Sequence, residues 1–253
     1  MEPEIDWRTA ITIRIASPIP PTHAGGSSFP PGSRLFASCS GEVQGFGQIS
    51  FIAPSPVALA MNIASSAAAD ADQLKRSIEY IDAHSPSGAV KHISSDLGGL
   101  YDYLEKTMVA VLFSYQGVEA FCNDVLMRAS GDGIEIKTKK GDRKRVTRRE
   151  AERQQSTSEK LGNLVPRILS IPTPKGKAVW EHFLSLQHTR DEVVHLKNQL
   201  IHAKDPKQDS DKVLIQLIAD DPRKWPLTTM QILDYFVTQP PPDWYEPLKK
   251  RLI

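Results

Sequence analysis

Three ionisable side chains, Arg190, Asp191 and His195, lie close together in the sequence. They belong to the last long segment of the chain in which apolar residues recur at helical spacing. Asp191 and His195 are four residues apart, and residues with that separation lie on the same side of a helix. The carboxylate can therefore orient the imidazole and favour its charged form, which suits acid–base chemistry. A helix rich in charged residues also contains such pairs by chance, so a purely structural pair is the alternative.

Arg190 differs from its neighbours because it falls within the apolar face of this predicted helix. That face is formed by Val179, Phe183, Leu186, Val193, Leu196 and Leu200. A buried charge is costly unless it is paired, so we expect Arg190 either to reach Glu119 or to lie at a seam between helices or subunits. His195 lies roughly 140° further round the helix. Symmetric pairing of two such helices would bring both arginines and both histidines into one cleft, which predicts a homodimer.

Helices predominate among the elements that must position these residues. Apolar residues at helical spacing predict helices over residues 57–83, 100–128 and 175–204. The second of these is apolar on all sides near its middle, which indicates a buried central helix. Thr147 and Glu150 form a capping-box pattern that opens a further, polar helix. The chain after Pro206 is expected to pack on the outside as a strand or short helix and a tail.

Residues 1–55 have a different character from the rest. Residues 11–16 alternate at period two, residues 18–33 are rich in Pro, Gly and Ser, and residues 41–52 mix glycine with β-forming residues. We therefore expect a small N-terminal β extension before a helical domain over 56–253, with its core at about 97–204. The fold class is mainly α: a helical bundle with this extension and a short basic β-hairpin insertion.

Positive charge is concentrated between Lys137 and Arg153, where nine of seventeen residues are Lys or Arg and three are acidic. Residues 134–147 have the form of a short hairpin with a glycine turn. We expect this hairpin to bind the phosphates of RNA, and a solvated charged loop is the alternative. The basic residues concerned are Lys139, Lys140, Arg143, Lys144, Arg145, Arg148 and Arg149.

Composition narrows the function classes further. A net charge of +1 argues against a polyanion-binding surface over the whole chain. The acidic N-terminus and the lack of a long apolar stretch indicate a cytoplasmic protein without membrane contact. Cys39 and Cys122 are too few for a disulfide framework, and we expect both to be buried thiols. His188, His195 and His202 would lie about 10.5 Å apart along one helix, too far to share a metal ion. No metal and no cofactor are expected.

The segment around Arg190 and His195 resembles the signature of the HEPN superfamily (higher eukaryotes and prokaryotes nucleotide-binding domains), in which His follows Arg after four to six residues. Ser114, Glu119 and Asn123 look like the small residue, Glu and Asn of the first core helix of many such domains. Glu159–Leu161, Pro166, Trp180 and Phe183 look like the segment that leads into the signature helix. The resemblance covers about residues 97–204.

The resemblance implies a helical bundle that dimerises through the signature helices and, in active members, cleaves RNA without metal. His195 would be the general base toward a ribose 2′-hydroxyl, giving a 2′,3′-cyclic phosphate, and Arg190 would stabilise charge on the phosphate. Asp191 would hold the imidazole, and Glu119 and Asn123 would position Arg190. Members controlled by tyrosine modification carry His-x-Tyr at this point, whereas this chain reads His195-Leu196-Lys197, which puts that form of control in doubt.

The leading hypothesis is therefore an endoribonuclease of the toxin or phage-defence kind, with RNA, a second copy of the chain and a neutralising antitoxin-like protein as partners. The alternative from another class is a catalytically silent HEPN-like module that binds a nucleotide, RNA or a protein, with Arg190 as a structural ion pair. A third possibility is a helical scaffold whose N-terminal β segment makes the functional contact.

Overall fold

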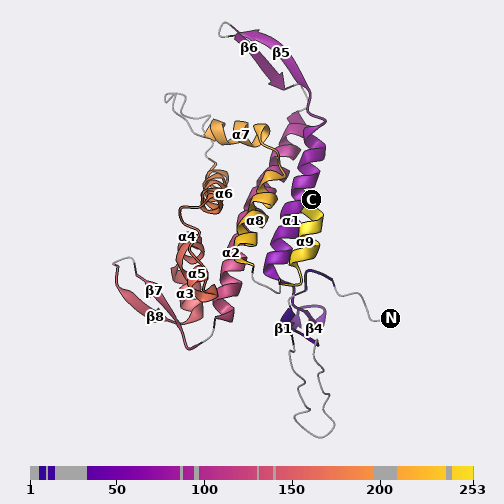
Figure 1. Cartoon of the computed structure of the whole chain (residues 1–253). Coiled ribbons are helices and arrows are strands. Elements are labelled where there is room, and N and C mark those ends of the chain that lie inside the picture. Colours follow the sequence, from indigo (N-terminus) through magenta and orange to yellow (C-terminus); the bar gives the residue numbers. More distant parts are fainter. Residues whose placement is uncertain are drawn as a thin grey trace.

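The computed structural model is mainly helical over the residues that it describes, which are 6–9, 11–14, 33–85, 88–93, 97–129, 131–138, 141–196, 210–237 and 241–252 (Figure 1). The helices are α1 (Pro56–Lys75), α2 (Leu97–Arg128), α3 (Arg148–Gln154), α4 (Thr157–Glu159), the π-helical turn η1 (Lys160–Leu164), α5 (Val165–Leu169), α6 (Ala178–Val194), α7 (Ser210–Ala219), α8 (Lys224–Phe236) and α9 (Tyr245–Leu252). The predicted mainly α class is confirmed.

Four antiparallel strand pairs occur within this part of the chain, each with two strands. They join β1 (Ile11–Arg14) to β2 (Arg34–Phe36), β3 (Ser38–Val43) to β4 (Gly47–Ile52), β5 (Tyr80–Ser85) to β6 (Gly88–Ile93), and β7 (Ile134–Lys137) to β8 (Arg143–Val146). The β elements expected before residue 55 and the hairpin expected near residue 140 are present. Whether the chain divides into domains at residue 55 stays a prediction.

The core lies where α2 packs against α1 on one side and against α8 and α6 on another. α1 presents small side chains to α2, including Ala60, Ala64 and Ala67, and these permit a close approach of the two helices. Gly117 of α2 also lies at this contact: a Cβ there would lie 2.7 Å from the sulfur of Met61, so the Met61 side chain would have to shift. The long α2 is thus the buried central helix that its apolar middle predicted.

Two expectations about the helices were wrong. The first helix ends at Lys75 rather than near residue 83, and Tyr80–Ser85 instead pairs with Gly88–Ile93 as a hairpin. Tyr80 and Ile81 are β-formers, and the helical spacing of Leu74, Ile78 and Ile81 did not reveal that the helix ends before them. The chain after Pro206 also does not pack outside: Trp225, Ile232 and Leu233 of α8 are fully buried in the main core.

The helical run from α4 through η1 to α5 contains Pro166, which lacks the N–H that would otherwise bind the carbonyl of Gly162. The N–H of Val165 reaches back five residues to the carbonyl of Lys160, which forms the π turn. The hydroxyl of Thr173 donates to the carbonyl of Gly162 at 2.7 Å and satisfies it. Lys160 is the first residue of this turn and is 2% exposed.

Candidate functional site

α6 carries the Arg190/His195 pair, but the helix is shorter than the 175–204 expected from the sequence. It begins at Ala178 and ends at Val194, and His195 caps it, with its backbone N–H donating to the carbonyl of Asp191 at 3.0 Å. Two β-branched residues, Val193 and Val194, precede this end and have low helix propensity. Leu200 and His202 lie outside the described residues, as does the remainder of the predicted helix.

Arg190 is half-buried and has two close partners. Its Nη1 lies 2.7 Å from Oδ1 of Asp191, and its guanidinium carbon lies 5.0 Å from the centre of the Tyr115 ring on α2. The expected pairing with Glu119 was wrong, because within the described residues no hydrogen bond or ion pair joins the two. The paired acid is the neighbouring Asp191, which is therefore engaged with the guanidinium rather than with the imidazole of His195.

Glu119 and Asn123 follow Tyr115 at intervals of four residues on α2, so the three side chains share one face of that helix. Oδ1 of Asn123 accepts a hydrogen bond from Nζ of Lys160 at 2.8 Å. Lys160 is 2% exposed, and no carboxylate of the described chain forms an ion pair with it. Asn123 thus holds a buried ammonium rather than Arg190, and no sequence pattern marked this lysine as buried.

The hydroxyl of Tyr115 lies at the meeting point of three elements. Burial raises its pKa above the usual range for tyrosine, whereas its hydrogen bond with Thr157 of α4 acts in the opposite direction. Glu119 also raises this pKa and Arg190 lowers it, so both charges are close enough to act on the phenol. Ser158 donates to Gln187 at 2.9 Å, which ties α4 to α6 beside this point. The site therefore joins Tyr115, Arg190 and Asp191 in one contact network.

His195 is exposed and lies apart from that network. Within the part of the chain that the structure describes, its side chain makes no hydrogen bond and no ion pair. His195 lies one residue past the end of α6, and the helical repeat places it roughly 140° round the axis from Arg190, which contacts Tyr115. A single chain therefore brings Arg190, Asp191, Tyr115 and Glu119 near one another but leaves His195 on the open side of the helix.

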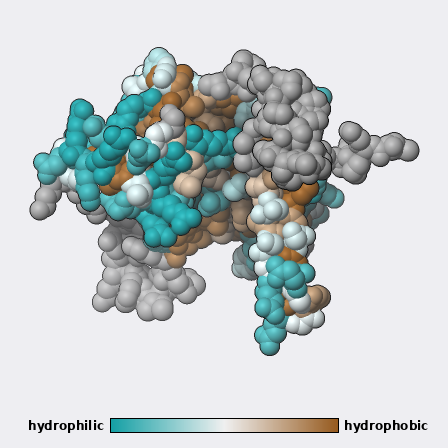
Figure 2. All heavy atoms as spheres, turned by 90° about the horizontal axis from the view of Figure 1, so that it is seen from below, coloured by the Kyte–Doolittle hydropathy of each residue, from teal (hydrophilic) through white to brown (hydrophobic). Residues whose placement is uncertain are grey.

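The basic hairpin β7–β8 has one buried and one charged face. Ile134, Ile136 and Val146 are buried. Cross-strand pairing places Glu135 opposite Arg145 and Lys137 opposite Arg143 on the solvent side. Figure 2 shows hydrophilic side chains gathered on the left of the molecule, the side on which Figure 1 places this hairpin and α3.

The other basic residues of this segment have different surroundings. The guanidinium of Arg148 has a structural role, since it donates hydrogen bonds to the carbonyl of Gly131 at 3.0 Å and to that of Met127 at 3.4 Å. Lys144 and Arg149 are exposed, and Lys139 and Lys140 lie outside the described residues.

Two further features are absent from the described ranges. No group of three or more His, Cys, Asp or Glu residues there is arranged to hold a metal ion. None of the helices described is long and apolar enough to cross a membrane. No protein-family model, no curated protein and no solved structure matches this chain.

Proposed function

We propose that the chain is a metal-independent endoribonuclease with a HEPN-like fold, and that its active form is a homodimer paired through α6. The observation that carries the proposal is the geometry of Arg190, a guanidinium held between Tyr115 and Asp191 while 35% of its side chain stays exposed. A fixed, partly desolvated guanidinium is suited to a phosphate, because its planar donors match the phosphate oxygens and it stays charged.

The surface of α6 between Arg190 and His195 supports the dimer. On a helical wheel this sector holds Leu184, Gln187, Asp191 and Val194. Leu184 and Val194 are 38% and 49% exposed, although both are apolar. An antiparallel crossing centred near residues 192 and 193 would set Val194 of one copy against Asp191 of the other and cover the exposed Val194 side chain. It would also set Arg190 of one copy opposite His195 of the other, so each copy would complete the site of its partner.

In such a site His195 would accept the proton of a ribose 2′-hydroxyl, and the 2′-oxygen would attack the adjacent phosphorus. Arg190 of the other copy would stabilise the charge that develops on the phosphate oxygens. The bond to the 5′-oxygen breaks, and that oxygen takes up the proton that the imidazole of the same His195 has received. The products are a 2′,3′-cyclic phosphate and a free 5′-hydroxyl, so protons and bonds balance without a metal.

The first test is incubation of the protein with labelled single-stranded RNA and transfer RNA in EDTA. We expect cleavage with cyclic phosphate ends, and a loss of roughly 100-fold or more in His195→Ala, as for removal of a general base. His188→Ala is the matched control, because His188 is an exposed histidine of the same helix outside the proposed site. Intact RNA with all substrates, or equal activity of the two variants, would refute the proposal.

A second test separates a shared site from one within a single chain. Arg190→Ala and His195→Ala are each expected to be inactive, so they are unfolded together, refolded as a mixture and assayed. If each site takes Arg190 from one copy and His195 from the other, every mixed dimer has one intact site. Random pairing then restores about a quarter of the wild-type activity. No recovery, although mixed dimers are detected by mass, would place both residues in the same chain.

One observation favours a second candidate, the catalytically silent module. Asp191 already neutralises Arg190, which is what a structural ion pair requires. In that case Arg190→Ala lowers stability, His195→Ala changes nothing, and RNA or a partner protein binds without being cleaved. The antitoxin-like partner belongs to the first candidate, because a free ribonuclease needs a neutralising protein.

A further inference from the structure

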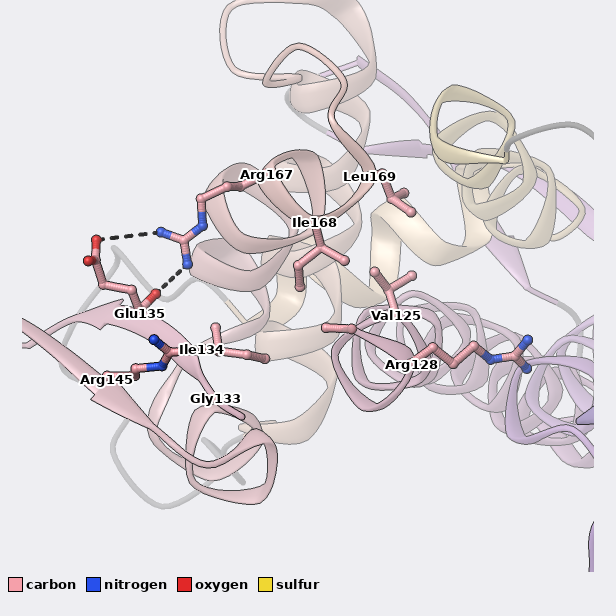
Figure 3. Close-up of a pocket in the computed structure, with 10 residues that line it drawn as sticks. Val125, Arg128, Gly133, Ile134, Glu135, Arg145, Arg167, Ile168 and Leu169 are labelled. Atoms are coloured by element: carbon pink, nitrogen blue, oxygen red, sulfur yellow. Dashed lines mark hydrogen bonds and ion pairs between the residues drawn. The ribbon is translucent and has the colours of Figure 1, made fainter. Parts of the chain in front are cut away.

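A cavity of about 730 Å³ lies away from Arg190, where the end of α2, the hairpin β7–β8 and α5 meet (Figure 3). Its floor is aliphatic and is formed by Val125, Ala129, Ile134, Ile168 and Leu169. Three arginines, Arg128, Arg145 and Arg167, and one acid, Glu135, complete the lining. A volume of this size is in the range of small-molecule sites, and its mixed lining fits a ligand with both an apolar ring and an anionic group.

The four charged side chains are not equivalent. Glu135 is shared by Arg143, at 3.2 Å, and Arg167, at 4.0 Å, and Arg167 also donates to the backbone carbonyl of Glu135. Arg128 forms an ion pair with Asp124 at 2.9 Å. The side chain of Arg145 has no hydrogen bond or ion pair with any described residue. In Figure 3, Arg145 and Arg167 stand on one side of the aliphatic floor and Arg128 on the other.

Next to Arg145, the backbone of Gly133 lies very close to strand β8. A Cβ on Gly133 would lie 2.7 Å from the carbonyl oxygen of Val146 and 3.4 Å from the side chain of Arg145. Only a glycine therefore permits this close approach of residue 133 to the backbone of β8, beside the side chain of Arg145. Cross-strand pairing with Glu135 fixes the position of Arg145 on β8.

We infer that this cavity is a subsite for one nucleotide of the RNA strand, and this inference rests on the proposed function. The unpaired guanidinium of Arg145 binds the phosphate, and its planar group can also stack on a base. The aliphatic floor packs against the ring of the base or ribose. The basic segment has no aromatic residue on which a base could stack, and the apolar cavity beside it provides this contact instead. Inorganic phosphate alone would leave that floor uncovered.

The test measures binding rather than cleavage. All proteins carry His195→Ala, and a fluorescent single-stranded RNA is titrated by anisotropy. Arg145→Gln is expected to weaken binding about tenfold, as for loss of one charge-assisted contact, and to reduce the slope against log salt by about 0.7. Arg76→Gln is the matched control, because Arg76 is an exposed arginine that lies outside the basic segment and does not line the cavity. It should stay within about twofold of the parent, since Arg76 already pairs with Asp72 at 2.6 Å.

Equal losses in the two variants, or no loss in either, would overturn the inference. Uridine and adenosine monophosphate and inorganic phosphate serve as competitors: the nucleotides should displace RNA at concentrations at which phosphate does not. Tight binding of a free nucleotide that Arg145→Gln abolishes, with RNA binding unchanged, would reject the assignment to the RNA strand. A selective effect of Arg145→Gln on binding, in a protein that cleaves no RNA, would refute the ribonuclease while the subsite stands.

Discussion

The guanidinium carbon of Arg190 on α6 lies 5.0 Å from the centre of the Tyr115 ring on α2, and this contact connects α6 to the central helix of the fold. Tyr115 is 7% exposed and also stacks near Phe183 of α6, with 6.3 Å between ring centres. The ring thus supports Arg190 from the side of the core, while Asp191 binds it from the side of solvent. The orientation of Arg190 depends on both partners.

We therefore predict that Tyr115→Leu lowers the free energy of unfolding by about 2 kcal/mol, because the aromatic and cation–π contacts are lost. It should also lower RNA cleavage more than tenfold, since Arg190 loses the surface that orients it. Urea denaturation and the EDTA cleavage assay measure the two effects. Tyr115→Phe is the control: it keeps the ring, loses only the bond with Thr157 and should cost about 1 kcal/mol. Equal activity of the Leu and Phe variants would show that the ring does not position Arg190.

The hydrogen bond from buried Lys160 to Asn123 gives a second prediction. Asn123→Leu removes the acceptor and leaves a buried ammonium alone, so the free energy of unfolding should fall by about 2–3 kcal/mol. Lys160→Met should cost less, because Asn123 is only half-buried and can bind water. In the double variant both polar groups are gone, and at least 1 kcal/mol of the loss should return. Additive losses in this cycle would mean that the two side chains do not interact.

These two contacts show what could and could not be predicted from the sequence. The capping box of Thr147 and Glu150 and the hairpin turn near Gly141 are local patterns, and both are present. The partners of Arg190 depend on how α2, α4 and α6 pack, so the sequence indicated a paired arginine but assigned the wrong acid. Lys160 is buried within the π turn η1, and an isolated lysine in the sequence gives no signal of such burial.

The misassigned elements have different physical causes. Leu74, Ile78 and Ile81 satisfy helical spacing, yet the chain leaves the helix at Lys75 because Tyr80–Ser85 finds a strand partner further along. α8 did carry a usable signal, since Trp225, Ile232, Leu233 and Phe236 repeat at helical spacing and are all buried. The Arg145 cavity could not be predicted, because its lining comes from three separate segments.

The two cysteines give a third prediction, and one of them corrects the expectation that both are buried. Cys39 is exposed on β3, whereas Cys122 is fully buried and burial raises the pKa of its thiol. A thiol reacts as the thiolate, so Cys122 should be inert in the folded protein. Titration with an aromatic disulfide reagent should therefore release one equivalent per chain rapidly and the second only in denaturant. Cys39→Ser should abolish the rapid phase; a rapid phase that persists would mean that the packing around Cys122 opens readily.

The capping box at the start of α3 gives a prediction about pH. Glu150 accepts from the backbone N–H of Thr147 at 2.8 Å and from its hydroxyl at 2.9 Å. These bonds hold the pKa of Glu150 below its ordinary value of 4.5. A carboxyl whose pKa is lower in the folded state stabilises that state at pH values above the unfolded pKa. The stabilisation is lost as the pH falls through the lower, folded value.

Glu150→Ala should therefore raise hydrogen–deuterium exchange of the α3 peptide relative to wild type at pH 6, and the difference should shrink as the pH falls below 4.5. The comparison is made between proteins at each pH, because intrinsic exchange rates also change with pH. Glu152→Ala is the matched control, since Glu152 is on the same helix but outside the box. A difference that stays constant from pH 6 to pH 3.5 would show that the charge of Glu150 does not stabilise the cap. In that case Thr147 alone would hold the start of α3, and Thr147→Ala would open it equally at every pH.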